Sequence, residues 1–192
     1  MSLPSSIKTE RLLLRAYEAG DGAWYYTMSL RNREHLMRYE AENPAVSLTC
    51  IDDAESLMQD FAEEWSGGAY LFLGAFERET GTFVAQIYVG CRNVELPEYE
   101  IGYFVDVDHE GRGFVTEAVG AIIKLLFETI GALRISINCD DTNLRSARVA
   151  ERCGMLREGH IRQNRRNPDG SVSGTLHYGM LREEYLQGGP VV

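Results

Sequence analysis

The sequence predicts a single domain of mixed α/β (α+β) architecture, with a mostly antiparallel central sheet and helices on its faces. Its 192 residues suit one domain with its own core. Apolar runs of strand length at 70–76 and 83–89 are joined by a turn at 79–81, which predicts a hairpin. A strand-like run at 99–106 then leads into a long helical segment at 115–130, which begins a strand–helix–strand unit.

The first third of the chain is predicted to hold one strand and two helices. Three leucines between two arginines predict a strand at 11–15. Asp21 is a candidate N-cap for a short helix that runs through Met28, and Thr49 or Asp52 begins the second helix. The apolar residues of that second helix recur at helical spacing: Ala54, Leu57, Met58, Phe61 and Trp65.

The second half of the chain continues with a strand, a helix and a closing hairpin. The long helix ends at Gly131, and Gly154 stands in the C-cap position of the later helix. The last two strands flank a turn at 167–170. The predicted ranges are 133–138 for the strand, 143–153 for the helix, and 155–165 and 174–182 for the hairpin.

The charge balance limits the class of partner. Lys and Arg number 19 against 29 Asp and Glu, which gives a net charge of −10. Such a surface repels phosphate backbones and anionic lipids, so we expect no nucleic-acid partner and no membrane partner. Cationic partners are favoured, and acidic residues are dense between Glu34 and Glu64.

The cysteines and the apolar runs indicate a cytoplasmic location. Cys50, Cys91, Cys139 and Cys153 form no Cys-x-x-Cys pair, so we expect reduced thiols and no metal site. No apolar run approaches the roughly 18 residues that a membrane span needs. Met1–Ser6 lacks the basic and apolar regions of a signal peptide.

The segment Asp106–Ala118, which joins a strand to the long helix, carries the clearest chemical signal. Gly111 and Gly113 allow a tight turn and a close approach to a ligand. The free N–H groups of the helix point into this turn, the helix dipole favours an anion there, and Arg112 adds a positive charge. A diphosphate fits this description, and a plain linker is the alternative. Thr116 stands where a dinucleotide fingerprint has its third glycine.

The same turn resembles the pyrophosphate motif of the GNAT acyltransferase superfamily, Gln/Arg-x-x-Gly-x-Gly/Ala. Gly111–Ala118 is similar to the form found in RimJ/RimL-like ribosomal-protein N-terminal acetyltransferases, as are Arg11–Arg15 and Tyr178–Tyr185. The resemblance covers nearly the whole chain. It implies a single acyl-CoA N-acyltransferase domain over residues 1–192, with its core at about 7–187.

The resemblance also implies acetyl-CoA as the cosubstrate, with no metal. The pantetheine arm would lie between splayed strands at 99–106 and 133–138. Two residues depart from the motif, Glu110 and Val115, and backbone amides survive both changes. A carboxylate near a diphosphate is unfavourable unless it points away. The implied cofactor-binding residues are Phe104, Val105, Asp106, Gly111, Arg112, Gly113, Phe114, Val115, Thr116, Asn143 and Ser146.

Two residues are expected to carry the chemistry. Glu100 is the candidate general base, because the family often carries a glutamate there and a partly buried carboxylate can accept a proton near neutrality. A solvent-facing strand residue is the alternative, and Glu98 and Asp106 are rival bases. Many family members use a tyrosine seven residues after the asparagine that is Asn143 here, but position 150 is alanine. Ser146 is therefore the candidate acid, or else a local cap.

The predicted function is direct transfer of an acetyl group from acetyl-CoA to a primary amine. The acceptor is a protein N-terminal α-amine or a small-molecule amine, bound by segments at about 20–66 and 160–178. A detoxifying acetyltransferase for aminoglycosides or polyamines is one alternative. A non-catalytic acyl-CoA-binding domain is another, which the missing tyrosine and Glu110 keep open. A homodimer also stays open.

Overall fold

The computed structural model describes residues 4, 6–67 and 70–188, and these residues form one eight-stranded sheet. Most of Met1–Ser6 therefore lies outside the described residues. The strand order is β1-β2-β3-β4-β5-β6-β8-β7, and every described pair of neighbours is antiparallel except β5 and β6. The strands are β1 (Ser6–Lys8), β2 (Leu12–Ala16), β3 (Tyr70–Glu77), β4 (Phe83–Asn93), β5 (Glu98–Val105), β6 (Arg134–Asp140), β7 (Leu156–Arg166) and β8 (Val172–Leu181).

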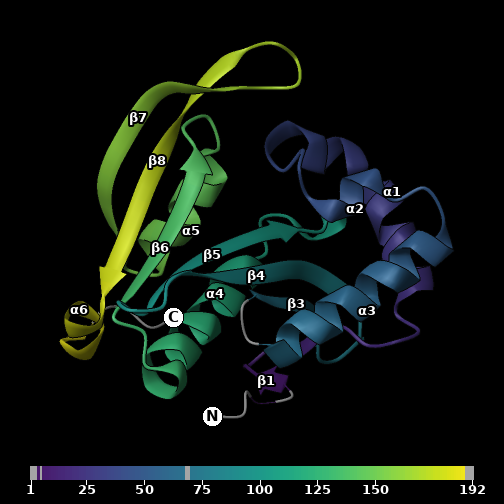
Figure 1. Ribbon diagram of the computed structural model, residues 1–192, viewed down its shortest axis with the longest axis horizontal. Coiled ribbons are helices and arrows are strands. Elements are labelled where there is room, and N and C mark those ends of the chain that lie inside the picture. Colours follow the sequence, from purple (N-terminus) through teal and green to yellow (C-terminus); the bar gives the residue numbers. More distant parts are fainter. Residues whose placement is uncertain (1–3, 5, 68–69, 189–192) are drawn as a thin grey trace.

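Helices cover both faces of this sheet, with α1 and α3 on one side and α4 and α5 on the other (Figure 1). No helix within the described ranges is long and apolar enough to cross a membrane. The helices are α1 (Gly22–Tyr39), α2 (Pro44–Ser47), α3 (Ile51–Gly67), α4 (Phe114–Lys124), α5 (Leu144–Arg152) and α6 (Arg182–Leu186), with a 3-10 turn η1 (Val107–His109) and a π-helical turn η2 (Leu125–Ile130).

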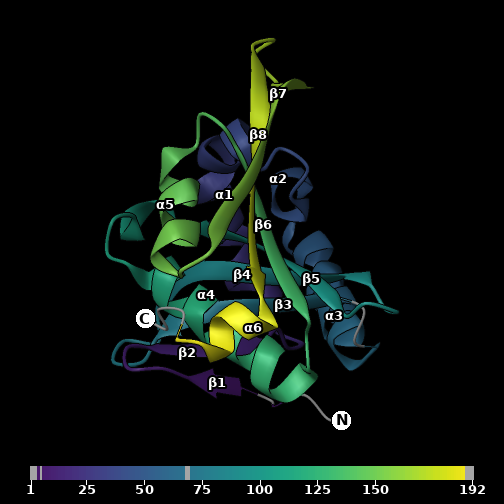
Figure 2. The ribbon, with the colours of Figure 1, turned by 90° about the vertical axis from the view of Figure 1, so that its left-hand side faces the viewer.

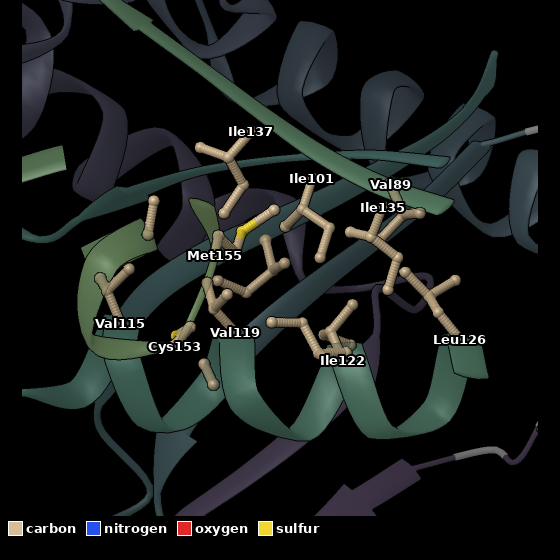
Figure 3. Close-up of a cluster of buried hydrophobic side chains, with 14 of the residues drawn as sticks. Val89, Ile101, Val115, Val119, Ile122, Leu126, Ile135, Ile137, Cys153 and Met155 are labelled. Carbon is tan, nitrogen blue, oxygen red and sulfur yellow. The ribbon is translucent and has the colours of Figure 1, made fainter. Parts of the chain in front are cut away.

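The apolar residues of α4 form the larger core. Val119 and Ile122 point from this helix toward Ile101 of β5 and toward Ile135 and Ile137 of β6 (Figure 3). Each of these five side chains is at most 1% exposed. Full burial of one such side chain stabilises the fold by about 1.5–3 kcal/mol, so this packing fixes α4 and its N-terminal turn against β5 and β6.

The fold class predicted from the sequence is confirmed: a mixed, mostly antiparallel sheet with helices on both faces. Four short elements, β1, α2, η1 and α6, were not predicted. The first helix is longer than predicted: it extends past Met28 and ends at Tyr39. Its inward face carries Ser29 and Asn32, both fully buried, so the apolar pattern is interrupted although the helical spacing continues to Leu36.

The strands β5 and β6 diverge along their length. Their described residues pair in parallel at Glu98–Glu100 with Arg134–Ser136. Beyond that point, 101–105 of β5 and 137–140 of β6 line opposite sides of one cavity. The predicted splayed strand pair is therefore present, and it opens toward the N-terminal ends of α4 and α5.

The β7–β8 hairpin rises beyond the rest of the sheet in both views (Figures 1 and 2). Its pairing runs from Leu156 with Gly179 to Arg166 with Val172. Arg165, near the end of this pairing, lines the same cavity as residues at the end of α1. The hairpin and α1 thus form opposite sides of one opening.

Candidate active site

A cavity of about 630 Å³ lies where β5 and β6 separate. Its walls come from the end of α1, from Tyr88 of β4, from 101–105 of β5, from 137–140 of β6 and from 142–149 at the start of α5. Of the predicted cofactor-binding residues, the cavity is lined by Phe104, Val105, Val115, Asn143 and Ser146. The others lie in the adjoining turn or inside the core: Asp106, Gly111, Arg112, Gly113, Phe114 and Thr116.

The turn before α4 has the backbone geometry that an anion site needs. Gly111 and Gly113 have φ values of +74° and +79°, in the left-handed region that favours glycine. An added Cβ at Gly111 would meet no atom within 4 Å, so the outer side of the turn is open. The N–H groups of 114–116, at the start of α4, precede the first intrahelical bond, in which the Glu117 N–H donates to the Gly113 carbonyl. Two guanidinium groups, those of Arg11 and Arg112, each lie 4.7 Å from the centre of the Phe114 ring.

The carboxylate of Glu110 does not lie free beside this turn. It forms an ion pair with Arg145 at the start of α5, and its other oxygen is 3.5 Å from Nδ1 of His35 on α1. The ion pair with Arg145 offsets the negative charge that makes a glutamate unfavourable in a diphosphate site.

Asp106 lies at the end of β5 and is completely buried, so it does not face the cavity. Its carboxylate accepts hydrogen bonds from Asn32 Nδ2 at 2.9 Å and from the Asp108 N–H at 3.1 Å, and it pairs with Arg31. Burial alone would raise the pKa of Asp106, yet the hydrogen bonds from Arg31 and Asn32 hold it below its ordinary value. The residue thus joins the turn to α1.

We expect Asp106→Ala to lower the free energy of unfolding by about 3–5 kcal/mol, because it leaves buried polar partners without their acceptor. Asp108→Ala is the matched control. The Asp108 side chain is 65% exposed and lies 3.3 Å from Arg31, so its loss should cost less than about 1 kcal/mol. Urea unfolding of both variants measures the difference, and equal effects would contradict a structural role for Asp106.

Ser146 lies at the start of α5, where its hydroxyl is 3.0 Å from the Tyr103 hydroxyl of β5. The Asn143 side chain accepts a hydrogen bond from the Ser146 N–H at 3.2 Å and so caps the helix. Burial raises the pKa of Tyr103 well above its ordinary value, which keeps this hydroxyl protonated. The structure therefore places two hydroxyl groups together in the cavity wall, and Tyr103 had not been singled out from the sequence.

Glu100 faces a different cavity. Its carboxylate forms an ion pair with Arg92 at 2.6 Å, and both residues line a second cavity of about 410 Å³ together with Glu98 and Arg134. Ser146 lines the first cavity and does not line the second, although Asn138 lines both. The structure thus does not bring Glu100 and Ser146 into one cavity. The role of Glu100 as a base stays a prediction, and its rival Glu98 is paired with Arg134 at 3.0 Å.

Glu40, directly after α1, is one of three carboxylates that line the first cavity, with Glu110 and Asp140. The Tyr88 hydroxyl donates to Glu40, at 3.2 Å from Oε2 and 3.4 Å from Oε1. Burial raises the pKa of Glu40 to about 7, although hydrogen bonds from Tyr88 and Asn43 act in the opposite direction. A carboxyl group that titrates near neutrality can accept a proton at physiological pH.

Comparison with known proteins identifies the family. The acetyltransferase (GNAT) domain family matches residues 11–156 of the chain. The chain is 27% identical over 161 residues to the uncharacterized N-acetyltransferase YnaD of Bacillus subtilis, covering 82% of this chain and 86% of that one. It is 24% identical over 151 residues to the spermidine N(1)-acetyltransferase of Vibrio cholerae, covering 79% and 82%.

The fold agrees with solved structures of such proteins. A structure of RimL, a ribosomal L7/L12 α-N-protein acetyltransferase in complex with coenzyme A, superposes with a TM-score of 0.83. The match covers 93% of this chain and 99% of that one at 18% sequence identity, so it shows the shared fold. The family match confirms the resemblance inferred from the sequence. The chain belongs to the GNAT family and is an acetyl-CoA-dependent N-acetyltransferase.

Proposed function

We propose that the chain transfers an acetyl group directly from acetyl-CoA to a single primary amine inside the first cavity. One observation carries this proposal: the cavity beside the glycine turn holds both a pair of hydroxyl groups, Tyr103 with Ser146, and the carboxylate of Glu40. Direct acetyl transfer needs a donor for the leaving sulfur and an acceptor for the amine proton. A domain that only binds acyl-CoA would need neither.

The residues present fit coenzyme A. The N–H groups of 111–116 would hold the diphosphate at the start of α4, and the open space beside Gly111 leaves room for it. The pantetheine arm would follow the gap between β5 and β6, with Asn143 and Ser146 on one side. The bound thioester would supply the acetyl group, and the Tyr103–Ser146 hydroxyls would protonate the departing thiolate.

The carboxylates that line the cavity favour an acceptor with one positive charge. Glu110 is engaged by Arg145, and the buried Asp140 accepts hydrogen bonds from Thr142 and Ser173. Glu40 is then the lining carboxylate left for an ammonium group among the described residues. A polyamine or an aminoglycoside carries several ammonium groups and would need several such carboxylates. We therefore favour a protein N-terminal α-amine or a small monoamine.

The test is an acetylation assay with a panel of amines. Acetyl-CoA would be incubated with peptides that begin with Ala, Ser or Thr, with propylamine, with spermidine and with kanamycin. Release of free thiol and the mass of the product report transfer. We expect a peptide or propylamine to be acetylated faster than spermidine or kanamycin. Thiol release that no amine accelerates would contradict the proposal and support a binding domain.

A further inference from the structure

The end of α1 turns the Glu40 side chain into the cavity. Glu40 follows the last helical residue, and its backbone N–H still donates to the Leu36 carbonyl at 2.6 Å. The chain then turns at Asn43, whose backbone N–H donates to the Glu40 carbonyl at 2.8 Å and whose side chain also hydrogen-bonds the Glu40 carboxylate. Hydrogen bonds from Asn43 and Tyr88 therefore fix the position of the Glu40 carboxylate in the cavity.

The ring of Tyr88 on β4 packs against Gly102, where a side chain would leave it no space. A Cβ added at Gly102 of β5 would lie 1.9 Å from the ring carbon Cζ of Tyr88, so a larger residue at this position displaces the ring. Burial and the charge of Glu40 raise the pKa of Tyr88 well above its ordinary value, so its hydroxyl stays a donor. Tyr88 and Asn43 each donate one hydrogen bond to the Glu40 carboxylate, which has about four lone-pair sites, so the remaining sites are available to a ligand in the cavity.

The groups around Glu40 do not neutralise it through a direct ion pair. Within the described part of the chain, no Arg, Lys or His lies within ion-pair distance of its carboxylate. The charge of Arg165 on β7 favours its ionised form from a greater distance. The other titratable and charged groups that line the cavity are His35, Arg38, Tyr39, Tyr88, Tyr103, Glu110, Cys139, Asp140, Arg145 and Arg165.

We propose that Glu40 binds the ammonium group of the acceptor and takes its proton, and that Tyr88 positions the carboxylate for this task. This inference rests on the proposed function. The Glu40 carboxylate accepts one proton from R–NH₃⁺ and passes it to solvent. The free amine nitrogen then bonds to the thioester carbonyl carbon, the carbon–sulfur bond breaks, and the second nitrogen proton reaches the thiolate through the Tyr103–Ser146 hydroxyls. The products are R–NH–acetyl, coenzyme A thiol and one released proton.

The expected pH dependence of turnover follows from the raised pKa of Glu40. Glu40 must be ionised to accept a proton, and its pKa is about 7. Turnover should therefore rise as pH increases through about 7. Glu40→Gln should lower kcat by about 10²–10⁴-fold and abolish this rise. Tyr88→Phe should move the midpoint of the rise to higher pH, because it removes a hydrogen bond that lowers the pKa of the carboxyl group. Glu42→Gln, the same change at an exposed residue that does not line the cavity, is the matched control.

Two measurements without turnover separate this inference from the proposed function. Calorimetry with the coenzyme A complex would compare binding of propylamine and of the N-terminal Ala, Ser and Thr peptides to wild type and to Glu40→Gln. We expect at least a tenfold weaker affinity in the variant for the probe that wild type binds best. Equal binding of every probe to both proteins would overturn the inference, whether or not wild type transfers acetyl groups.

Thermal unfolding gives the second readout. A raised carboxyl pKa in the folded state makes ionisation unfavourable to folding, so wild type loses stability as pH rises from 4.5 through 7. Glu40→Gln carries no such group and should have the higher midpoint at pH 8, with a smaller difference at pH 5.

The inference is overturned if the variant keeps the wild-type pH–rate profile. If wild type binds an amine through Glu40 yet acetylates none, the ammonium-binding role of Glu40 holds, and the proposed transfer fails together with the proton step that depends on it.

Discussion

Gly113→Pro is expected to weaken coenzyme A binding by about 100-fold or more. Gly113 has a φ of +79°, whereas proline fixes φ near −65° and lacks the N–H donor. The change therefore both distorts the turn and removes one amide from the anion site. The loss of the Gly113 N–H and of one neighbouring hydrogen bond in the distorted turn, at about 1.5 kcal/mol each, corresponds to roughly this factor. Calorimetric titration with coenzyme A measures it.

Gly81→Pro is the matched control for this prediction. Gly81 also has a positive φ, +69°, but it lies in the turn between β3 and β4 and does not line the cavity. It should lower the thermal midpoint without weakening coenzyme A binding in the folded protein. If Gly113→Pro proves unstable, Gly111→Ala strains the same turn at a φ of +74° and keeps the N–H donor. Unchanged affinity in a folded Gly113→Pro protein would place the diphosphate elsewhere.

Loss of either cavity hydroxyl is expected to lower kcat on the order of 10²-fold. Ser146 and Tyr103 are joined hydroxyl to hydroxyl at 3.0 Å, so they should deliver one proton as a unit. Ser146→Ala and Tyr103→Phe should each leave coenzyme A affinity within a few-fold of wild type. The double variant should be little worse than either single variant, since residues that act as a unit have non-additive effects.

Steady-state kinetics of the four proteins test this pair directly. Full additivity would mean that the two hydroxyls act independently. A normal kcat in Ser146→Ala together with a large loss in Tyr103→Phe would assign the proton to Tyr103 alone. In that case Ser146 would keep only its position after the Asn143 cap. Normal rates in both single variants would contradict the assignment of either hydroxyl as the acid.

Much of the fold could be predicted because the local sequence pattern identifies most of its strands. The runs at 70–76 and 83–89 lie within β3 and β4, and the turn that separates them is bounded as expected. The glycine turn was recognised for the same reason, since a positive φ at Gly111 and Gly113 requires that residue type. The end of α1 was missed because Ser29 and Asn32 are buried on its inward face. Ser29 donates to the Tyr26 carbonyl within the helix, and Asn32 donates to Asp106 and accepts from the Val107 N–H.

That error also hid a candidate site residue. With the first helix ending near Met28, Glu40 is one acidic residue in an acidic segment, and nothing local marks it as buried. Its place in the cavity depends on the length of α1 and on Tyr88, which is 48 residues away. From the sequence alone, Tyr103 is likewise indistinguishable from an ordinary strand residue. Its proximity to Ser146 arises where β5 meets α5, a contact that no local pattern encodes.

A crystal structure of the complex with coenzyme A would show whether one cavity holds the thioester on one wall and the amine on the other. We expect the diphosphate to lie on the N–H groups of 111–116. We expect the sulfur to lie within hydrogen-bond reach of Tyr103 or Ser146, in the cavity that Glu40 lines. A diphosphate bound away from the glycine turn, or a sulfur in the second cavity beside Glu100 and Arg92, would contradict this arrangement.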